Sequence, residues 1–274
     1  FFLILLMIRY IIKNLGELFM PNITLGFRFK EFIMKIEVEK GDLSYANEMN
    51  MTLTFPESFT ASDFNMFFTI CYFIKKDRFN DKVEIPFSAL ESFLPSKIKN
   101  KKRFHEDIVK FTDKIKFVSK IYTIKTIEEE VYGLDMFFTS IQAYRNKQIL
   151  LLEVNKKAKE FLFSFSRYLY FNLYEFCGIK SKYSKSIFRI LIQFKNAKSN
   201  FKGEKELTLT KKQFRDLLSI PKKYKPAHID QKVLEPSSSE LSDGYFNKVD
   251  FVKEFSDSND IIAYKIIFDD NNRK

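Results

Sequence analysis

The sequence predicts an α+β fold of two tandem winged helices, each a helix-turn-helix followed by a β-hairpin wing. Apolar residues recur at spacings of three and four in some segments and alternate in others, so both helices and strands are expected. The order helix, strand, helix, helix, hairpin occurs twice along the 274 residues, which indicates two like modules. The chain is 45% apolar with only seven Gly and seven Pro, a composition typical of folded globular domains.

The first module opens with a helix that starts near Thr60. Thr60 or Ser62 can cap it, and Asp63 lies in the first turn, where the helix dipole favours a negative charge. Apolar residues follow at helical spacing, and the helix is expected to end near Lys76. The alternation over residues 82–87 then predicts a short strand.

A helix pair and a sheet complete this module. Ser88 is expected to cap a short helix over residues 89–94, and a long helix with apolar residues every three or four positions follows Pro95. Strands are predicted over residues 121–127, 131–141 and 148–154, with polar turns between them. In a winged helix, this helix pair forms the helix-turn-helix and the hairpin forms the wing.

The second module repeats this order after a helix over residues 155–163 and an aromatic connector over residues 167–176. Ser181 is expected to start a helix that runs to residue 197, Gly203 marks a turn, and residues 206–209 form a strand. Thr210 caps the next helix. A tight turn at residues 219–221, a helix over residues 227–241 and a hairpin of residues 245–255 and 261–268 complete the module.

These elements divide the chain into an N-terminal extension (residues 1–44), a first winged helix (residues 45–166) and a second winged helix (residues 167–274). Residues 1–12 are strongly apolar but fall short of the ~20 residues of a membrane span, and they lack the pattern of a signal peptide. We interpret residues 1–33 as a non-native or translated upstream extension with Met34 as the start, or else Met20 or Met49. The alternative is an anchor that touches a membrane.

The net charge of +11 favours a polyanionic partner, either nucleic acid or an anionic membrane surface. The location of the charge favours nucleic acid, because basic residues gather on the helix pair of each module. In the first module these are Lys99, Lys101, Lys102, Arg103 and Lys110, and in the second Lys211, Lys212, Arg215, Lys222, Lys223, Lys225 and Lys232. Each run taken alone is also compatible with an ordinary solvated helix end.

Lysine and arginine near phosphates release condensed counterions and supply much of the affinity for double-stranded DNA. Side chains in the first turns of an inserted helix reach base edges, and here those are Lys223, Tyr224, His228 and Gln231. Gln231 can pair with adenine through two hydrogen bonds. Gln231 can equally be an exposed helix residue, and Tyr224 an aromatic that faces the core and fixes the turn.

Enzyme chemistry finds little support in the sequence. The two histidines, His105 and His228, do not lie at the spacing of metal ligands, which argues against zinc hydrolases and metal-dependent nickases. No Gly-rich phosphate loop is present, so an ATPase or helicase is not expected. Cys71 and Cys177 are far apart in apolar runs, as buried free thiols of a reducing compartment are. We therefore expect a cytoplasmic protein without catalysis, metal or cofactor.

The second half resembles the initiator replication protein family of theta-replicating (iteron) plasmids. The resemblance rests on Ser181-x-Tyr183-Ser184, on residues 188–191, on residues 214–220 and on Val233-Leu234-Glu235-Pro236, with a looser match over residues 59–72. Residues 237–239, three serines in a row, depart from the apolar and basic residues usual in the family. The departure puts in doubt a phosphate contact there, and we interpret these serines as a polar helix face.

The resemblance implies tandem winged helices that bind direct repeats of double-stranded DNA at a plasmid origin, promote local melting and recruit the host initiator and the replicative helicase. It also implies a homodimer in equilibrium with a monomer, with the dimer interface in the first winged helix. A winged-helix transcriptional regulator without initiation activity is the alternative. A membrane-associated protein anchored through residues 1–12 is the third hypothesis.

Overall fold

The computed structural model describes residues 41–77, 80–93, 101–125, 129–163 and 168–270. It divides the chain into Phe1–Gly41 and one compact unit, Asp42–Lys274. The apolar residues 1–12 and the candidate start positions Met20 and Met34 lie outside the described residues. No helix in the described ranges is long and apolar enough to cross a membrane.

The first winged helix consists of α4 (Ala61–Lys76), β3 (Lys82–Pro86), α5 (Phe87–Glu91), α6 (Lys101–Ile115), β6 (Phe138–Tyr144) and β7 (Ile149–Val154). Its strands pair antiparallel in the order β3–β7–β6. The start of α4 is confirmed, because the Thr60 hydroxyl accepts from the Asp63 amide and the Asp63 carboxylate accepts from the Thr60 amide. The predicted cap of α5 is wrong, since Pro86 is the N-cap and Ser88 lies inside the helix.

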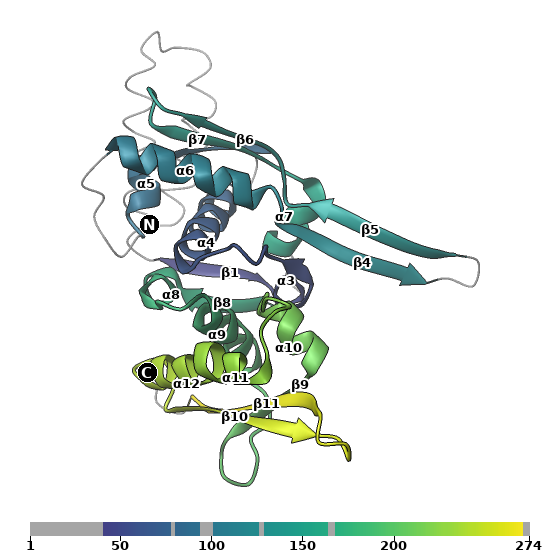
Figure 1. Cartoon of the computed structure of the whole chain (residues 1–274). Helices are drawn as coiled ribbons and strands as arrows, with labels where there is room; N and C mark the ends of the chain where they lie inside the picture. The colour runs from purple at the N-terminus through teal and green to yellow at the C-terminus, as the bar shows by residue number, and fades with distance from the viewer. Residues whose placement is uncertain (1–40, 78–79, 94–100, 126–128, 164–167, 271–274) are drawn as a thin grey trace. The chain divides into compact units, whose positions relative to one another are not determined.

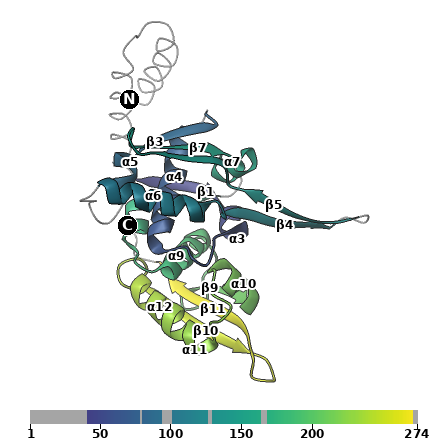
Figure 2. The same cartoon turned by 45° about the horizontal axis from the view of Figure 1, so that its top comes forward.

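A β-hairpin is inserted between α6 and β6. The strand expected over residues 131–141 is in fact two strands, β5 (Glu130–Met136) and β6, which belong to different sheets and meet at the buried Phe137. β5 pairs with β4 (Ser119–Lys125), which pairs with β2 (Leu53–Thr54). Both views show the β4–β5 hairpin extending away from the rest of its module (Figures 1 and 2). The wing of the first module is therefore β6–β7.

Two further strands and three helices frame the first module. β1 (Asp42–Ala46) pairs antiparallel with β8 (Tyr168–Asn172), and α3 (Asn47–Thr52), α7 (Lys156–Phe163) and α8 (Leu173–Gly178) lie around them in sequence. The expected connector over residues 167–176 is thus wrong, because most of it forms β8 and α8. Pairing with β1 buries Leu169 and Phe171, and the Asn172 side chain caps α8 by accepting from the Tyr174 amide at 2.9 Å.

The second winged helix consists of α9 (Lys182–Phe194), β9 (Lys205–Thr210), α10 (Lys211–Leu217), α11 (Pro226–Ile229), a π-helical segment (Asp230–Leu234), α12 (Glu235–Ser242), β10 (Lys248–Phe255) and β11 (Ile261–Asp269). Its strands pair in the order β9–β11–β10. As in the first module, the first strand of the module lies beside the last. The repeated order confirms the predicted tandem winged helices.

Helix α9 packs against both modules. It contacts α4 of the first module, β8 that frames this module, and α12 of the second module. Arg189 on α9 is 3% exposed, and its guanidinium lies over the rings of Phe68 and Phe55 at 4.8 and 5.3 Å from their centroids. The Arg189 carbonyl accepts from the Asn50 side chain at 3.0 Å. The two winged helices therefore share a buried core around α9 rather than meeting only at a linker.

Candidate nucleic-acid interface

The helix-turn-helix of the second module is fixed by local hydrogen bonds. The Thr210 hydroxyl accepts from the Gln213 amide at 3.2 Å, and the Gln213 side chain accepts from the Thr210 amide at 3.0 Å, so the capping box starts α10 as predicted. Ser219 turns the chain with φ of +49°. Its hydroxyl donates to the carbonyl of Phe55 in the first half at 2.9 Å.

Arg215 holds the turn between α10 and α11. Its guanidinium donates to the carbonyls of Pro221 at 2.7 Å, Tyr224 at 3.1 Å and Lys222 at 3.3 Å. A planar guanidinium suits several acceptors at once. The structure therefore gives Arg215, predicted as a DNA contact, a place inside the turn with its side chain directed at the main chain.

The remaining predicted basic residues of the second module lie on the surface. Those with exposed side chains are Lys211, Lys212, Lys222, Lys223, Lys225 and Lys232, and His228 and Gln231 are exposed with them. Lys212 pairs with Asp216 at 2.5 Å, and this hydrogen bond and charge raise the pKa of Lys212. The turn and the start of the second helix thus present a basic surface, which we call the turn surface (residues 222–232).

Three side chains stack along the turn surface. Lys232 places its ammonium 5.2 Å from the centroid of the Tyr224 ring, and the rings of Tyr224 and His228 are 5.9 Å apart. Tyr224 is half-buried. Burial, the nearby Tyr224 and a hydrogen bond of the Tyr183 hydroxyl to the Tyr224 oxygen raise the pKa of Tyr183 on α9. Tyr224 therefore anchors the turn to α9, while His228 Nδ1 accepts from the Lys225 amide at 3.3 Å.

The helix that follows the turn is continuous from Pro226 to Ser242 but contains a π-helical segment. Pro236 lacks an amide hydrogen, so it cannot complete the α-helical ladder, and the Glu235 amide instead donates to the carbonyl of Asp230. The Asp230 carboxylate pairs with Lys253 of β10 at 2.6 Å. This pair ties the start of the helix to the wing and leaves Gln231 and Lys232 exposed.

The serines after Pro236 are not the predicted polar helix face. Ser237 is fully buried, and its hydroxyl accepts from Ser184 of α9 at 3.2 Å. Ser238 donates to the carbonyl of Val249 at 2.6 Å. These small side chains allow α12 to pack closely on α9 and β10, whereas Ser239 alone of the three is exposed.

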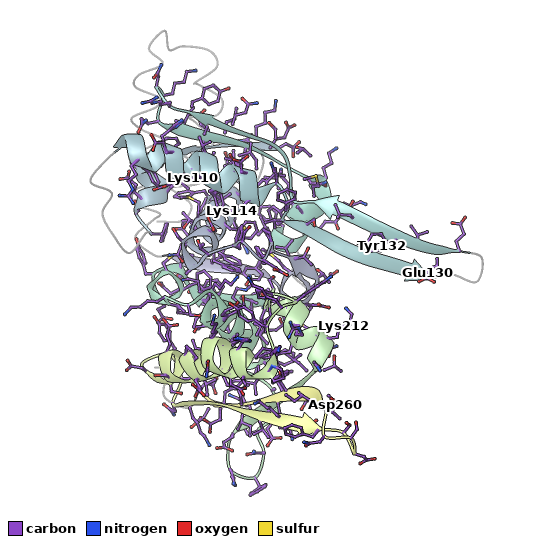
Figure 3. The ribbon with its side chains drawn as sticks, viewed as in Figure 1. Lys110, Lys114, Glu130, Tyr132, Lys212 and Asp260 are labelled. Carbon is purple, nitrogen blue, oxygen red and sulfur yellow. The ribbon has the colours of Figure 1, made fainter. Side chains whose placement is uncertain are left out.

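In the first module, α6 is amphipathic with Phe104, Ile108, Phe111 and Ile115 buried. Arg103 and Lys110 lie on its exposed side, and Lys110 lies 3.9 Å from Asp107. Figure 3 shows Lys110 and Lys114 on this helix, but Lys114 pairs with Asp63 at 2.7 Å and so ties α6 to the cap of α4. Lys101 and Lys102 belong to α6 without described side chains, and Lys99 lies outside the described residues.

The wing tip of the first module adds basic residues that were not among the predicted DNA contacts. The turn between β6 and β7 carries the exposed Arg145, Asn146 and Lys147, which were predicted only as a polar turn. Two exposed basic side chains separated by one residue at a wing tip suit phosphate contacts. The signal that could have found them is the pair of basic residues in the turn predicted after residue 141.

The second wing has the opposite charge. Its turn, residues 256–260, carries the exposed Asp257 and Asp260 and no basic residue, and Figure 3 shows Asp260 at the end of the β10–β11 hairpin. Carboxylates repel DNA phosphates. Among the described residues no group of three or more His, Cys, Asp or Glu side chains is arranged to hold a metal ion.

The family comparisons match both modules. Residues 42–192 match the family model described as "Initiator Replication protein, WH1", and residues 210–268 match "Initiator Rep protein, WH2". The chain belongs to the initiator replication protein family. Helix α9 lies within the first matched segment, up to residue 192, although it also packs on α12.

A solved structure of another initiator shares the fold. A crystal structure of the Pi initiator protein in complex with iteron DNA superposes with a TM-score of 0.58 at 13% identity, and the match covers 85% of this chain and 99% of that one. Domains 2 and 3 of RctB match with a TM-score of 0.45 at 11% identity, over 78% of this chain and 84% of that chain. No curated protein matches the sequence closely enough to count as a relative.

Proposed function

We propose that this initiator binds direct repeats of double-stranded DNA at a plasmid origin, promotes melting nearby and recruits the host initiator and replicative helicase. The observation that carries the proposal is the turn surface, where Lys222 and Lys223 lie exposed in the turn of the helix-turn-helix and Lys232 lies exposed on its second helix. The Pi initiator, which shares the fold, was crystallised with iteron DNA. The chain acts in this proposal by binding alone, without catalysis.

Binding is tested with 60-base-pair tiles, spaced about every 30 base pairs, of the plasmid that carries the gene, by fluorescence anisotropy over a series of salt concentrations. Lys222→Glu with Lys223→Glu is expected to weaken binding to the preferred tile and flatten the salt dependence, because fewer counterions are released. The control, Lys156→Glu with Lys180→Glu, changes the net charge equally at exposed positions away from the turn surface. Equal effects of both variants would reject the turn surface as the DNA contact.

Initiation is distinguished from transcriptional regulation by plasmid maintenance. A plasmid that carries the preferred tile and its flanks, but no other origin, should replicate only in cells that supply the intact chain. Repression of a promoter beside the tile without plasmid maintenance would favour the transcriptional regulator instead.

We propose that the first winged helix also supplies a dimer interface, and that dimer and monomer exchange. Strand β5 is at the edge of its sheet, and Tyr132, Leu134 and Met136 on one face of it are 69%, 52% and 44% exposed. Figure 3 shows Tyr132 on this hairpin. Edge strands with exposed apolar side chains pair readily with another chain. Tyr132→Lys with Leu134→Lys should convert a dimer to a monomer in light scattering, and an unchanged mass would contradict the proposal.

A further inference from the structure

The loop that joins α9 to β9, residues 195–204, is a closed turn rather than an irregular connection. The Asn200 side-chain oxygen accepts from the amides of Lys202 at 2.9 Å and Glu204 at 3.0 Å. The Asn200 amide donates to the carbonyl of Glu204 at 2.7 Å, and the Gly203 amide donates to the carbonyl of Asn200 at 3.0 Å. Gly203 has φ of +82°, which only glycine adopts without strain. Phe201 and Lys202 therefore form the tip of a well-defined turn.

The side chain at the tip of this turn is an aromatic ring exposed to solvent. Phe201 is 94% exposed, more than any other large apolar side chain among the described residues, of which Tyr132 follows at 69%. Single exposed apolar residues are common on protein surfaces. What distinguishes Phe201 is its place at the tip of a hydrogen-bonded turn together with basic neighbours.

Three lysines belong to the loop, and Lys202 lies beside the Phe201 ring. Lys195, Lys198 and Lys202 form no ion pair with the described residues, and the Lys202 ammonium lies 5.7 Å from the centroid of the Phe201 ring. Glu204 pairs with Lys248 at 2.9 Å, and Glu206 accepts from Asn200 at 2.8 Å and lies 3.9 Å from Lys265. The loop therefore presents a positive charge beside an exposed aromatic ring.

The loop lies at the end of the sheet opposite the wing tip. Lys205, just after the loop, pairs with Phe268 at the far end of β11, whereas the wing turn follows Phe255, which pairs with Ile261. The start of the second helix of the helix-turn-helix is near the wing, because Asp230 pairs with Lys253. The end of α12 is near the loop, since the Ser242 hydroxyl accepts from the Val249 amide, next to Lys248. The loop and the turn surface are therefore at different ends of this sheet.

We propose that the loop over residues 195–204 binds single-stranded DNA, with Phe201 stacked on a base and Lys198 and Lys202 at adjacent phosphates. An aromatic side chain beside basic residues is the arrangement that binds single strands without sequence preference, because every base offers a face for stacking. A paired duplex hides those faces, so the loop discriminates between the two forms of DNA. The inference rests on the proposed function, since melting at the origin supplies the strand.

The test uses the full chain, fluorescein-labelled dT20 and the preferred duplex tile. Phe201→Ala should weaken binding to dT20 about tenfold, by loss of one stacking contact, and leave duplex binding unchanged. Phe201→Tyr should retain most of the affinity for dT20. Lys198→Gln with Lys202→Gln should weaken binding to dT20 and flatten its salt dependence.

The chain contains no tryptophan, so Phe201→Trp introduces a single reporter. Stacking on a base should quench its fluorescence when dT20 is added, whereas Tyr168→Trp, at a position 58% exposed on β8, should show no quenching. Equal dT20 binding by Phe201→Ala and the natural sequence overturns the inference. So does fluorescence of the Phe201→Trp variant that responds to anionic phospholipid vesicles but not to dT20. Loss of duplex binding with retained dT20 binding would overturn the proposed function alone.

Discussion

The guanidinium of Arg215 donates to the carbonyl of Pro221 at 2.7 Å and thereby ties α10 to the turn that leads into α11. Arg215→Ala leaves three main-chain carbonyls without this donor. We expect a loss of about 1–3 kcal/mol in the free energy of unfolding, measured by urea denaturation, and weaker duplex binding with an unchanged salt slope. Arg215→Lys should not restore this stability, because lysine lacks the planar guanidinium group.

The matched control for Arg215 is Lys212→Ala. Lys212 lies on the same helix but is 87% exposed, so its surface ion pair should contribute little to stability. A stable Arg215→Ala variant with a flattened salt slope would instead show that Arg215 contacts phosphate.

The two wings should respond oppositely to changes of charge. Arg145→Glu with Lys147→Glu should weaken duplex binding and reduce its salt dependence, because the wing of the first module loses its phosphate contacts. Asp257→Asn with Asp260→Asn should tighten duplex binding a few-fold at low salt, because two repulsive charges are removed. Both pairs are measured by anisotropy at two salt concentrations. Wings that do not approach DNA would give no change in either pair.

Most of the second module could be predicted from the sequence because its signals are local. Thr210 and Gln213 form a capping box, Gly203 takes a positive φ, and the alternating hairpin strands lie close in sequence. The first module was harder to predict, because Phe137 passes from one sheet to another without a turn residue. β8 was missed because it pairs with β1, more than 120 residues earlier.

The candidate site was predicted by residue type but not by role. The positions of basic residues near the helix pair follow from the sequence, and the exposed ones lie where helix periodicity places them. Arg215 and Ser237 differ because their partners come from tertiary contacts: Arg215 faces the carbonyls of its own turn, and Ser237 faces Ser184 across the packing of two helices. Periodicity cannot show which polar side chain finds a buried partner.

The buried pair of Ser184 and Ser237 should be measurable as stability. Ser237→Ala leaves the Ser184 hydroxyl buried without its acceptor, which should lower the free energy of unfolding by about 1–2 kcal/mol. The exposed Ser239→Ala serves as the control and should change it by less than about 0.5 kcal/mol. A larger side chain, Ser237→Leu, should destabilise more, because α12 and α9 approach closely here. Equal stabilities of Ser237→Ala and Ser239→Ala would show that the pair contributes nothing.

Lys185 on α9 should make the free energy of unfolding change with pH in the alkaline range. Its side chain is fully buried, donates to the carbonyl of Phe176 and lies 4.4 Å from the centroid of the Phe176 ring. Burial lowers the pKa of Lys185 to about 8, although the nearby Cys177 and Glu240 act in the opposite direction. Below pH 8 the lysine is charged in both the folded and the unfolded chain, so the folded state bears the whole cost of burying the charge.

Between pH 8 and the ordinary lysine pKa of 10.5, Lys185 keeps its proton in the unfolded chain but has lost it in the folded chain. The contribution of this residue to stability therefore increases with pH, by up to about 1.4 kcal/mol per pH unit. Lys185→Met should stabilise the chain at pH 7, and its advantage over lysine should shrink between pH 8 and pH 9.5. Urea denaturation of both forms measures this difference, and the exposed Lys180→Met should show no such trend. A constant difference between Lys185→Met and lysine across this range would mean that Lys185 keeps an ordinary pKa in the folded chain.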